Sequence, residues 1–230
     1  MAKKKVQEEV VVIARKKPEK KPKIVVFIGY SCSGKDKCLN LFNEISRYPI
    51  VVSTTSRPIR EGEIEGKDYF FISKKKFQLG IVEKQFVEFR EYHTLLNGKP
   101  DVWYYGVNKN QVGKGNRVAV LDPVGLEAIE AFYGKENVLS VWVDCPTKLR
   151  KQRNISRGDY DEIEFNRREK ADKRTFKGIK KKCDCVIYND FTSEEALKED
   201  VLRLFELSDF VFAEKRMNQK SKLEIKRKKK

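Results

Sequence analysis

The sequence predicts an α/β protein in which a parallel central sheet lies between two layers of helices. Short apolar runs of strand length alternate along the chain with longer segments of helical periodicity, the pattern of such three-layer domains. The first apolar run, residues 23–29, is rich in β-branched residues and ends in glycine, as is typical of a buried strand in a parallel sheet. A chain of 230 residues is long enough for one such domain with a substantial core.

Five segments are predicted to be strands because each is short and mostly apolar. They are residues 23–29, 50–53, 117–121, 138–143 and 185–188. Helices are predicted between them, where apolar residues recur at helical spacing; in the first, Leu39, Phe42 and Ile45 share one side. The predicted helices are 35–46, 126–132, 146–156, 162–177 and 193–207.

Residues 54–109 interrupt this alternation. They are rich in glycine, aromatic and charged residues, with short alternating runs such as residues 68–72. We therefore expect a small, mostly β insertion within the α/β domain.

The net charge of +16 is concentrated at the two ends of the chain. Residues 1–23 hold nine Lys or Arg against three Glu, and residues 213–230 hold nine against two, so the ends carry 13 of the 16 units. We expect 1–22 to be a mostly disordered extension, 23–212 the folded domain and 213–230 a basic tail. Such ends can contact nucleic acid or an acidic partner.

Two classes of protein are disfavoured by the sequence. The five cysteines are odd in number and irregularly spaced, so they do not suggest a disulfide framework. The apolar patch at residues 10–13 is too short for a signal peptide or a membrane span. We therefore expect a cytoplasmic protein without membrane contact.

The strongest motif runs from Gly29 to Asp36. It matches G-x-x-x-x-G-K directly after a predicted strand and before a predicted helix, the context in which this motif forms a phosphate-binding loop. Glycines let the backbone approach phosphates, amide groups and the helix N-terminus attract them, and the lysine neutralises their oxygens. The predicted ATP-binding residues here are Gly29, Ser31, Ser33, Gly34, Lys35 and Asp36.

Asp36 departs from the motif, which has Ser or Thr at this position to bind Mg²⁺. One interpretation is a degenerate loop in a protein that has lost catalysis, since a carboxylate repels phosphates. The other is that Asp36 itself holds the metal or its waters, as suits a hard cation. The presence of Lys35 favours the second interpretation.

A longer motif follows the loop. Residues 53–69 resemble the S-x-T-T-R-x-x-R-x-G-E-x-x-G-x-D-Y motif of guanylate kinases, and the resemblance as a whole covers about residues 23–210. It implies a phosphate-loop kinase that uses Mg²⁺ and ATP to phosphorylate GMP or dGMP. It also implies that residues 53–109 bind the monophosphate and that residues 147–177 form a helical lid.

The resemblance assigns the phosphate group of GMP to Arg57, Arg60, Tyr69 and Tyr105. Two arginines three residues apart and a phenol can hold a phosphate with charge-assisted hydrogen bonds, which is consistent with that role. Without the motif around them, the two arginines would fit a solvated basic turn equally well.

The resemblance assigns the guanine base to Glu88, Ser53 and Asp122. A glutamate fits the adjacent N1–H and 2-amino donors of guanine, which adenine does not present. Val107 stands where the family has Ser or Thr, so one hydrogen bond to the base is expected to be missing. Residues 95–103 are an insertion that the motif does not place.

The lid is expected to supply three catalytic arginines, Arg153, Arg157 and Arg168, which would act with Lys35. Cations of this kind stabilise the charge that spreads over the γ oxygens during phosphoryl transfer. Asn189 matches an asparagine on the adenine side of the family's ATP site.

Two rival functions remain open from the sequence. Val107 allows a deoxynucleoside monophosphate kinase with a different base preference. Asp36 and Val107, with Val120 in place of a family acid near the metal, also allow a catalytically weakened domain that binds a protein partner. Lys35 and the lid arginines argue against the second rival.

Overall fold

The computed structural model describes residues 22–228, apart from 97–98, 114, 157–160 and 191–192. The predicted N-terminal extension lies outside the described residues, except for Pro22. In chain order the elements are β1 (Ile24–Ile28), α1 (Lys35–Ser46), β2 (Thr54–Thr55), β3 (Phe70–Phe71), α2 (Lys74–Val82), β4 (Phe86–Leu96), β5 (Lys99–Asn108), α3 (Lys109–Val112), β6 (Arg117–Val120), α4 (Pro123–Tyr133), η1 (Lys135–Asn137), β7 (Val138–Asp144), α5 (Thr147–Ile155), α6 (Glu162–Thr175), η2 (Ile179–Lys181), β8 (Cys185–Tyr188) and α7 (Glu194–Lys228).

Four strands form the parallel central sheet that the sequence predicts, and the structure gives their order as β6-β1-β7-β8. The predicted strand at residues 50–53 is wrong. Ile50 makes a single parallel bridge with Val118, and the chain then leaves for a second sheet. There the carbonyl of Ser53 accepts a hydrogen bond from the amide of Phe70 at 2.9 Å, which draws this segment away from the central sheet.

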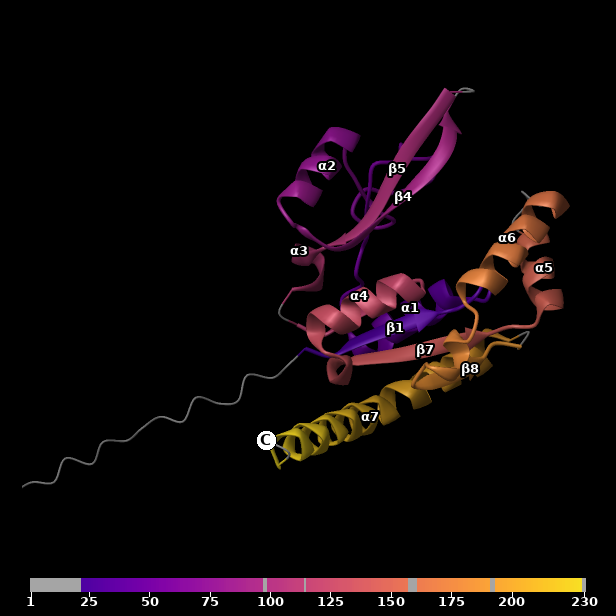
Figure 1. The fold of residues 1–230 in the computed structure, drawn as a ribbon. Coiled ribbons are helices and arrows are strands. Elements are labelled where there is room, and N and C mark those ends of the chain that lie inside the picture. The colour runs from indigo at the N-terminus through magenta and orange to yellow at the C-terminus, as the bar shows by residue number, and fades with distance from the viewer. Residues whose placement is uncertain (1–21, 97–98, 114, 157–160, 191–192, 229–230) are drawn as a thin grey trace, which may run out of the picture.

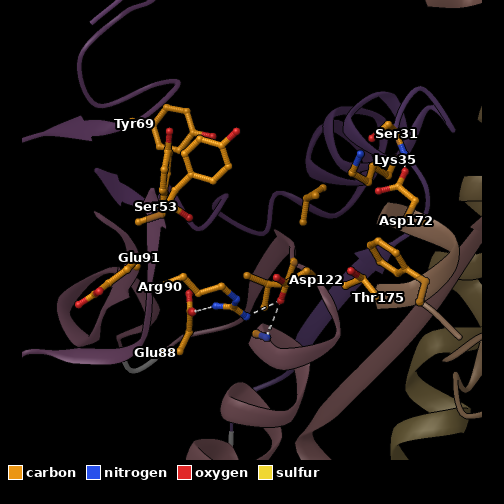
Figure 2. Close-up of a pocket in the computed structure, with 18 residues that line it drawn as sticks. Ser31, Lys35, Ser53, Tyr69, Glu88, Arg90, Glu91, Asp122, Asp172 and Thr175 are labelled. Carbon is orange, nitrogen blue, oxygen red and sulfur yellow. Dashed lines mark hydrogen bonds and ion pairs between the residues drawn. The ribbon is translucent and has the colours of Figure 1, made fainter. Parts of the chain in front are cut away.

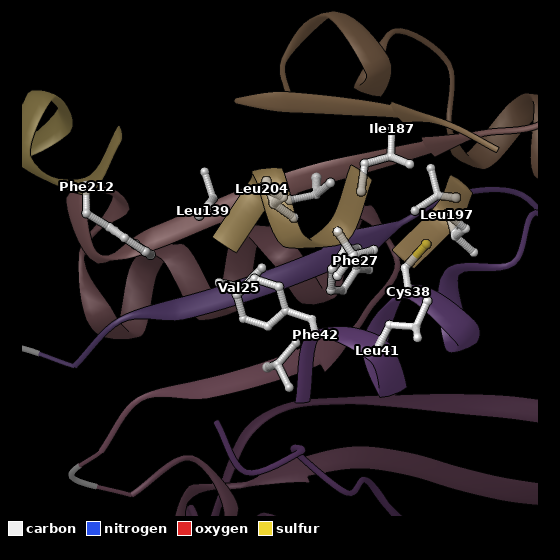
Figure 3. Packing of buried hydrophobic residues seen from close by; sticks show 14 residues of the cluster. Val25, Phe27, Cys38, Leu41, Phe42, Leu139, Ile187, Leu197, Leu204 and Phe212 are labelled. Carbon is white, nitrogen blue, oxygen red and sulfur yellow. The ribbon is translucent and has the colours of Figure 1, made fainter. Parts of the chain in front are cut away.

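The side chains of β1 alternate between two cores, one on each face of the central sheet. Val25 and Phe27 belong to the core that includes α1 and α7 (Figure 3). Ile24, Val26 and Ile28 belong to the core that includes α4. Figure 1 shows α4 and α7 on opposite sides of the sheet, so the predicted three-layer arrangement is confirmed.

The insertion forms a second sheet, in the order β3-β2-β5-β4, with α2 packed against it. Phe77 of α2 stacks on Phe86 with ring centroids 4.2 Å apart, which gives this part a small core of its own. Within the expected insertion, residues 95–96 and 99–103 lengthen the antiparallel pair of β4 and β5, which projects away from the central sheet (Figure 1).

The last helix is longer than the sequence predicts. α7 continues past residue 207 to Lys228, through a segment in which most residues have high helix propensity and none is Gly or Pro. We expected the folded domain to end at residue 212, but side chains beyond this residue still contact the domain. Phe212 is buried, Lys215 donates to the carbonyl of Val138, and Arg216 donates to Asn137 at 3.0 Å.

None of the described helices combines the length and apolar composition needed to cross a bilayer. The five cysteines are free thiols. Burial raises the pKa of Cys38 to about 12, so this thiol contributes packing to the core and does not ionise at neutral pH.

Candidate functional site

The phosphate loop connects β1 to α1 at the carboxyl end of the central sheet, where open α/β sheets bind ligands. Glycine is required at two positions of the loop because neighbouring groups approach its backbone closely. A Cβ on Gly29 would lie 2.7 Å from both the Ser33 hydroxyl and the Val143 carbonyl. Gly34 has a φ of +90°, and a Cβ there would lie 2.2 Å from the Asn189 amide nitrogen.

The N-terminus of α1 is open to an anion. Gly34 is its N-cap residue and supplies no side-chain hydrogen bond to the first turn. Amide groups of an uncapped first turn, together with the helix dipole, form a site for phosphate. The Lys35 ammonium stands beside this site, 3.8 Å from the carboxylate of Asp36.

Side chains from other elements hold the loop in place. The Asn189 amide, which follows β8, donates to the carbonyl of Ser33 at 2.7 Å. Arg153 of α5 donates to the same carbonyl at 3.1 Å and to the Asn189 side-chain oxygen at 3.1 Å. Asn189 is therefore buried against the loop, and one of the three predicted lid arginines is already in contact with it.

A cleft of about 490 Å³, which we call the first cleft, lies between the phosphate loop and the second sheet (Figure 2). It brings together residues that the sequence places far apart. From the loop come Gly29, Ser31 and Lys35, and facing them are Ser53, Tyr69, Tyr105, Glu88 and Asp122.

The two predicted phosphate-binding arginines do not line this cleft. Arg57 is 4% exposed and makes a two-pronged ion pair with Glu63, at 3.0 and 2.6 Å. Its guanidinium carbon also lies 5.5 Å from the centroid of the Tyr69 ring. Arg60 is exposed on the following turn, where its amide donates to Glu63. Of the expected phosphate-binding group, Tyr69 and Tyr105 face the cleft directly.

The residues assigned to the base carry an additional partner. Arg90 of β4 donates to both Glu88 and Asp122 (Figure 2). Burial raises the pKa of Glu88, and the charge of Arg90 partly opposes that shift. Val107 is fully buried in the core shared with α4, so the position where a hydroxyl was expected does not face the cleft.

A second cleft, of about 590 Å³, lies on the other side of the phosphate loop. Cys32, Gly34 and Asp36 form one wall, and α5, Asn189 and the start of α7 form the others. Asp36, the candidate metal ligand, is 68% exposed at this second cleft. Val120, by contrast, lines the first cleft.

The predicted lid corresponds to α5 and α6, which lie side by side (Figure 1). Arg168 is exposed on α6 and lines neither cleft, and Arg157 lies outside the described residues. Asp172 of α6 instead reaches the phosphate loop, where it accepts a hydrogen bond from the Ser31 amide at 2.6 Å.

Three residues at the site were not identified from the sequence. Arg90 could have been, because it lies two residues after Glu88 and therefore on the same face of a strand. Arg150 is almost fully buried at the base of the lid, and nothing local distinguishes it from its exposed basic neighbours. Asp172 carries no local signal either, since its partner lies 141 residues away.

Comparisons with known proteins point to one family. The family model "Guanylate kinase" matches residues 21–205. The guanylate kinase of Wolinella succinogenes is 36% identical over 187 residues, which cover 78% of this chain and 83% of that protein. The guanylate kinase of Mycoplasma mobile is 33% identical over 75% of this chain and 87% of that protein. A crystal structure of guanylate kinase from Anaplasma phagocytophilum, 23% identical, has a TM-score of 0.54 over 84% of this chain and 86% of that one, which shows a shared fold.

Proposed function

The chain belongs to the guanylate kinase family, and on that premise we propose that it transfers the γ-phosphoryl group of ATP to GMP or dGMP. The phosphate loop carries this proposal, because it separates the two clefts. Ser31 and Lys35 face the first cleft, and Gly34 and Asp36 face the second. Nucleotides bound in the two clefts would meet at the loop with their phosphates facing each other.

ATP would occupy the second cleft, with its base between α5 and the start of α7 and its phosphates on the loop amides and Lys35. Because the Asn189 amide is engaged by the Ser33 carbonyl, its contribution would be to hold the loop rather than to contact adenine through that amide.

GMP would occupy the first cleft, with its phosphate at Tyr69 and Tyr105 and its base at Glu88. Ser53, which lines the same cleft, would contact the base as the family motif implies. Arg57 would contribute positive charge from beside the Tyr69 ring, whose centroid lies 5.5 Å from its guanidinium carbon. Arg60, on an exposed turn, would contact the phosphate after GMP has bound.

The reaction requires positioning and charge stabilisation. An oxygen of the GMP phosphate attacks the γ phosphorus of ATP, and the bond from that phosphorus to the β–γ bridging oxygen breaks, which leaves GDP and ADP. No general base is needed because the attacking oxygen is already anionic. Lys35 and the lid arginines Arg153, Arg157 and Arg168 would balance the charge as the lid closes and excludes water.

Asp36 fits a nucleotide-bound Mg²⁺ site. Mg²⁺ at such sites takes one or two protein carboxylates and fills its other positions with phosphate and water oxygens. The ion would supply neutralisation of the β and γ oxygens, and Asp36 would orient it or its waters.

The test is a coupled assay of ADP release with GMP, dGMP, AMP and dTMP as acceptors. GMP and dGMP should give the highest kcat/KM. A higher value with AMP or dTMP would replace the proposed substrate and favour a nucleoside monophosphate kinase of different base preference.

Lys35→Ala separates a kinase from a protein-interaction domain. It should lower kcat by about 100-fold to 1000-fold, the effect of removing one group that stabilises transition-state charge. Lys198→Ala, on the exposed surface of α7, is the control and should leave the rate unchanged. If the unmodified chain releases no ADP and Lys35→Ala preserves its cellular role, the interaction domain is correct.

The basic ends support a separate proposal, contact with nucleic acid or an acidic partner in the cytoplasm. Binding through Lys and Arg releases counterions, so the affinity should fall steeply as salt rises. Deleting residues 1–21 and 218–230 should abolish this binding while ADP release stays unchanged. Binding that survives the deletion would place the contact on the folded domain instead.

A further inference from the structure

Arg90 joins the two acidic residues assigned to the base. Its Nη1 donates to Oε2 of Glu88, and its Nη2 donates to Oδ1 of Asp122 (Figure 2). Glu88 and Arg90 belong to β4 in the second sheet, whereas Asp122 precedes α4 in the central domain. All three residues line the first cleft.

The geometry of β4 places the charged groups of Glu88 and Arg90 side by side. Glu88 and Arg90 are two residues apart on β4, so their side chains leave the same face of the strand. Their partners on β5 are Val107 and Tyr105, of which Tyr105 lines the cleft. A carboxylate and a guanidinium therefore stand next to each other along one wall of the cleft.

Asp122 has a second contact that fixes its position. Its Oδ1 accepts a hydrogen bond from the Gly125 amide at 2.8 Å, which makes it the N-cap of α4. Both contacts use Oδ1, so together they hold the carboxylate in one orientation. In that orientation Asp122 supports Arg90, and Glu88 and Arg90 line the cleft beside it.

Accessibility supports this division. The side chain of Arg90 is 31% exposed at the cleft and that of Glu88 is 10% exposed. Removing such charges from water costs free energy that an apolar contact between β4 and α4 would avoid. A link between β4 and α4 that served only stability would not need these charged groups. Contact with a polar ligand would need them.

We propose that Arg90 donates to O6 and N7 of guanine while Glu88 accepts from N1–H and the 2-amino group. The inference rests on the proposed function. Along this edge guanine presents two donors followed by two acceptors, and the Glu88–Arg90 pair presents two acceptors followed by two donors. Adenine breaks the match, because its 6-amino donor lies between the acceptors N1 and N7. Arginine is the side chain that most often contacts O6 and N7 of guanine.

The proposal also accounts for Val107. That side chain is 0% exposed and packs in the core with Val112 and Leu126, so it offers the base no hydrogen bond. Arg90 supplies donors from the neighbouring strand, and the specificity for a 6-oxo purine is retained with a different residue.

The test compares kcat/KM of the full chain for GMP and 7-deaza-GMP. The analogue keeps the N1–H, 2-amino and O6 groups and replaces N7 by a C–H. The unmodified chain should prefer GMP by about 10-fold, within the range for a paired arginine–guanine contact. Arg90→Ala should lower kcat/KM for GMP and remove this preference.

Two further variants are needed to interpret the result, a second substitution of Arg90 and a control. Arg90→Met keeps a long side chain that can fill the same space but has no hydrogen-bond donor, so it should also lose the preference for GMP. It carries the test if Arg90→Ala does not fold. Arg203→Ala, on α7 with a side chain 72% exposed, is the matched control and should change neither value.

Three outcomes would overturn the inference in different ways. A preference for GMP that persists in both Arg90 variants would show that Arg90 links β4 to α4 and does not contact the base. An unmodified chain that phosphorylates GMP and 7-deaza-GMP equally well would remove the N7 contact but leave the kinase proposal standing. A chain that phosphorylates neither GMP nor dGMP would overturn the proposed function along with the inference.

Discussion

Arg150 and Glu169 form a buried ion pair that joins α5 to α6. Nη1 lies 2.6 Å from Oε2, and the two side chains are 2% and 9% exposed. The same guanidinium donates to the Cys145 carbonyl at 3.1 Å and lies over the ring of Tyr30, 4.9 Å from its centroid. The pair therefore links α5 and α6 to the end of β7 and to the phosphate loop.

Arg150→Ala should lower the free energy of unfolding by about 3 kcal/mol, because it leaves the Glu169 carboxylate buried without its main partner. The value lies at the low end of the usual range since Lys173 remains 3.3 Å from that carboxylate. Replacing both residues together with leucine should recover most of the loss. Chemical denaturation measures these changes, and a double variant as unstable as the single one would contradict this account.

Tyr69 and Tyr105 should act together on the phosphate of GMP, since their ring centroids are 5.9 Å apart at the first cleft. Tyr69→Phe and Tyr105→Phe should each raise the KM for GMP about 10-fold, because each removes one hydrogen bond to a charged group. The KM for ATP should not change. Tyr188→Phe, 56% exposed at the end of β8, is the control. An altered KM for ATP would place the tyrosines at the other nucleotide.

Glu88 should make activity sensitive to mild acid. Burial raises its pKa, so on acidification this carboxyl takes up a proton at a higher pH than an ordinary glutamate does. The protonated form cannot accept from both guanine donors, so kcat/KM for GMP should fall as pH drops through that pKa. The GMP phosphate titrates near pH 6, roughly as a phosphoserine does, and contributes a separate limb.

The pH profile of Glu88→Gln separates these two contributions. The limb due to Glu88 should disappear in this variant, and the limb due to the phosphate should remain. Identical profiles for the two proteins would show that Glu88 does not titrate in this range.

Gly34 and Gly178 allow conformational strain to be distinguished from a steric clash. Both have positive φ, +90° and +80°, but a Cβ on Gly178 would meet nothing within 4 Å, whereas one on Gly34 would meet the Asn189 amide. Gly178→Ala should cost about 1–2 kcal/mol of stability and keep normal turnover. Gly34→Ala should pay the same strain and also displace the loop, so that kcat falls more than about 100-fold. Equal turnover in the two variants would show that the contact with Asn189 is not needed.

The phosphate loop and the central sheet could be predicted because their determinants are local. An apolar strand, a glycine-rich turn and a helix follow one another between residues 23 and 46, so the motif and its structural context are visible together. The strand predicted at residues 50–53 was wrong because its determinants are not local. Its apolar residues suit a strand, but two sheets compete for its backbone, and the hydrogen bond from Phe70 to Ser53 lies in the second sheet.

The sequence by itself determined the family motif and the alternation of strands and helices. The tertiary structure alone decided how the charged side chains pair. Arg90 meets Asp122 across 32 residues, Arg150 meets Glu169 across 19, and Asp172 meets the Ser31 amide across 141. Hydrogen bonds and ion pairs act over a few ångströms, so the partner of a charge depends on which distant groups the packed elements bring within that range.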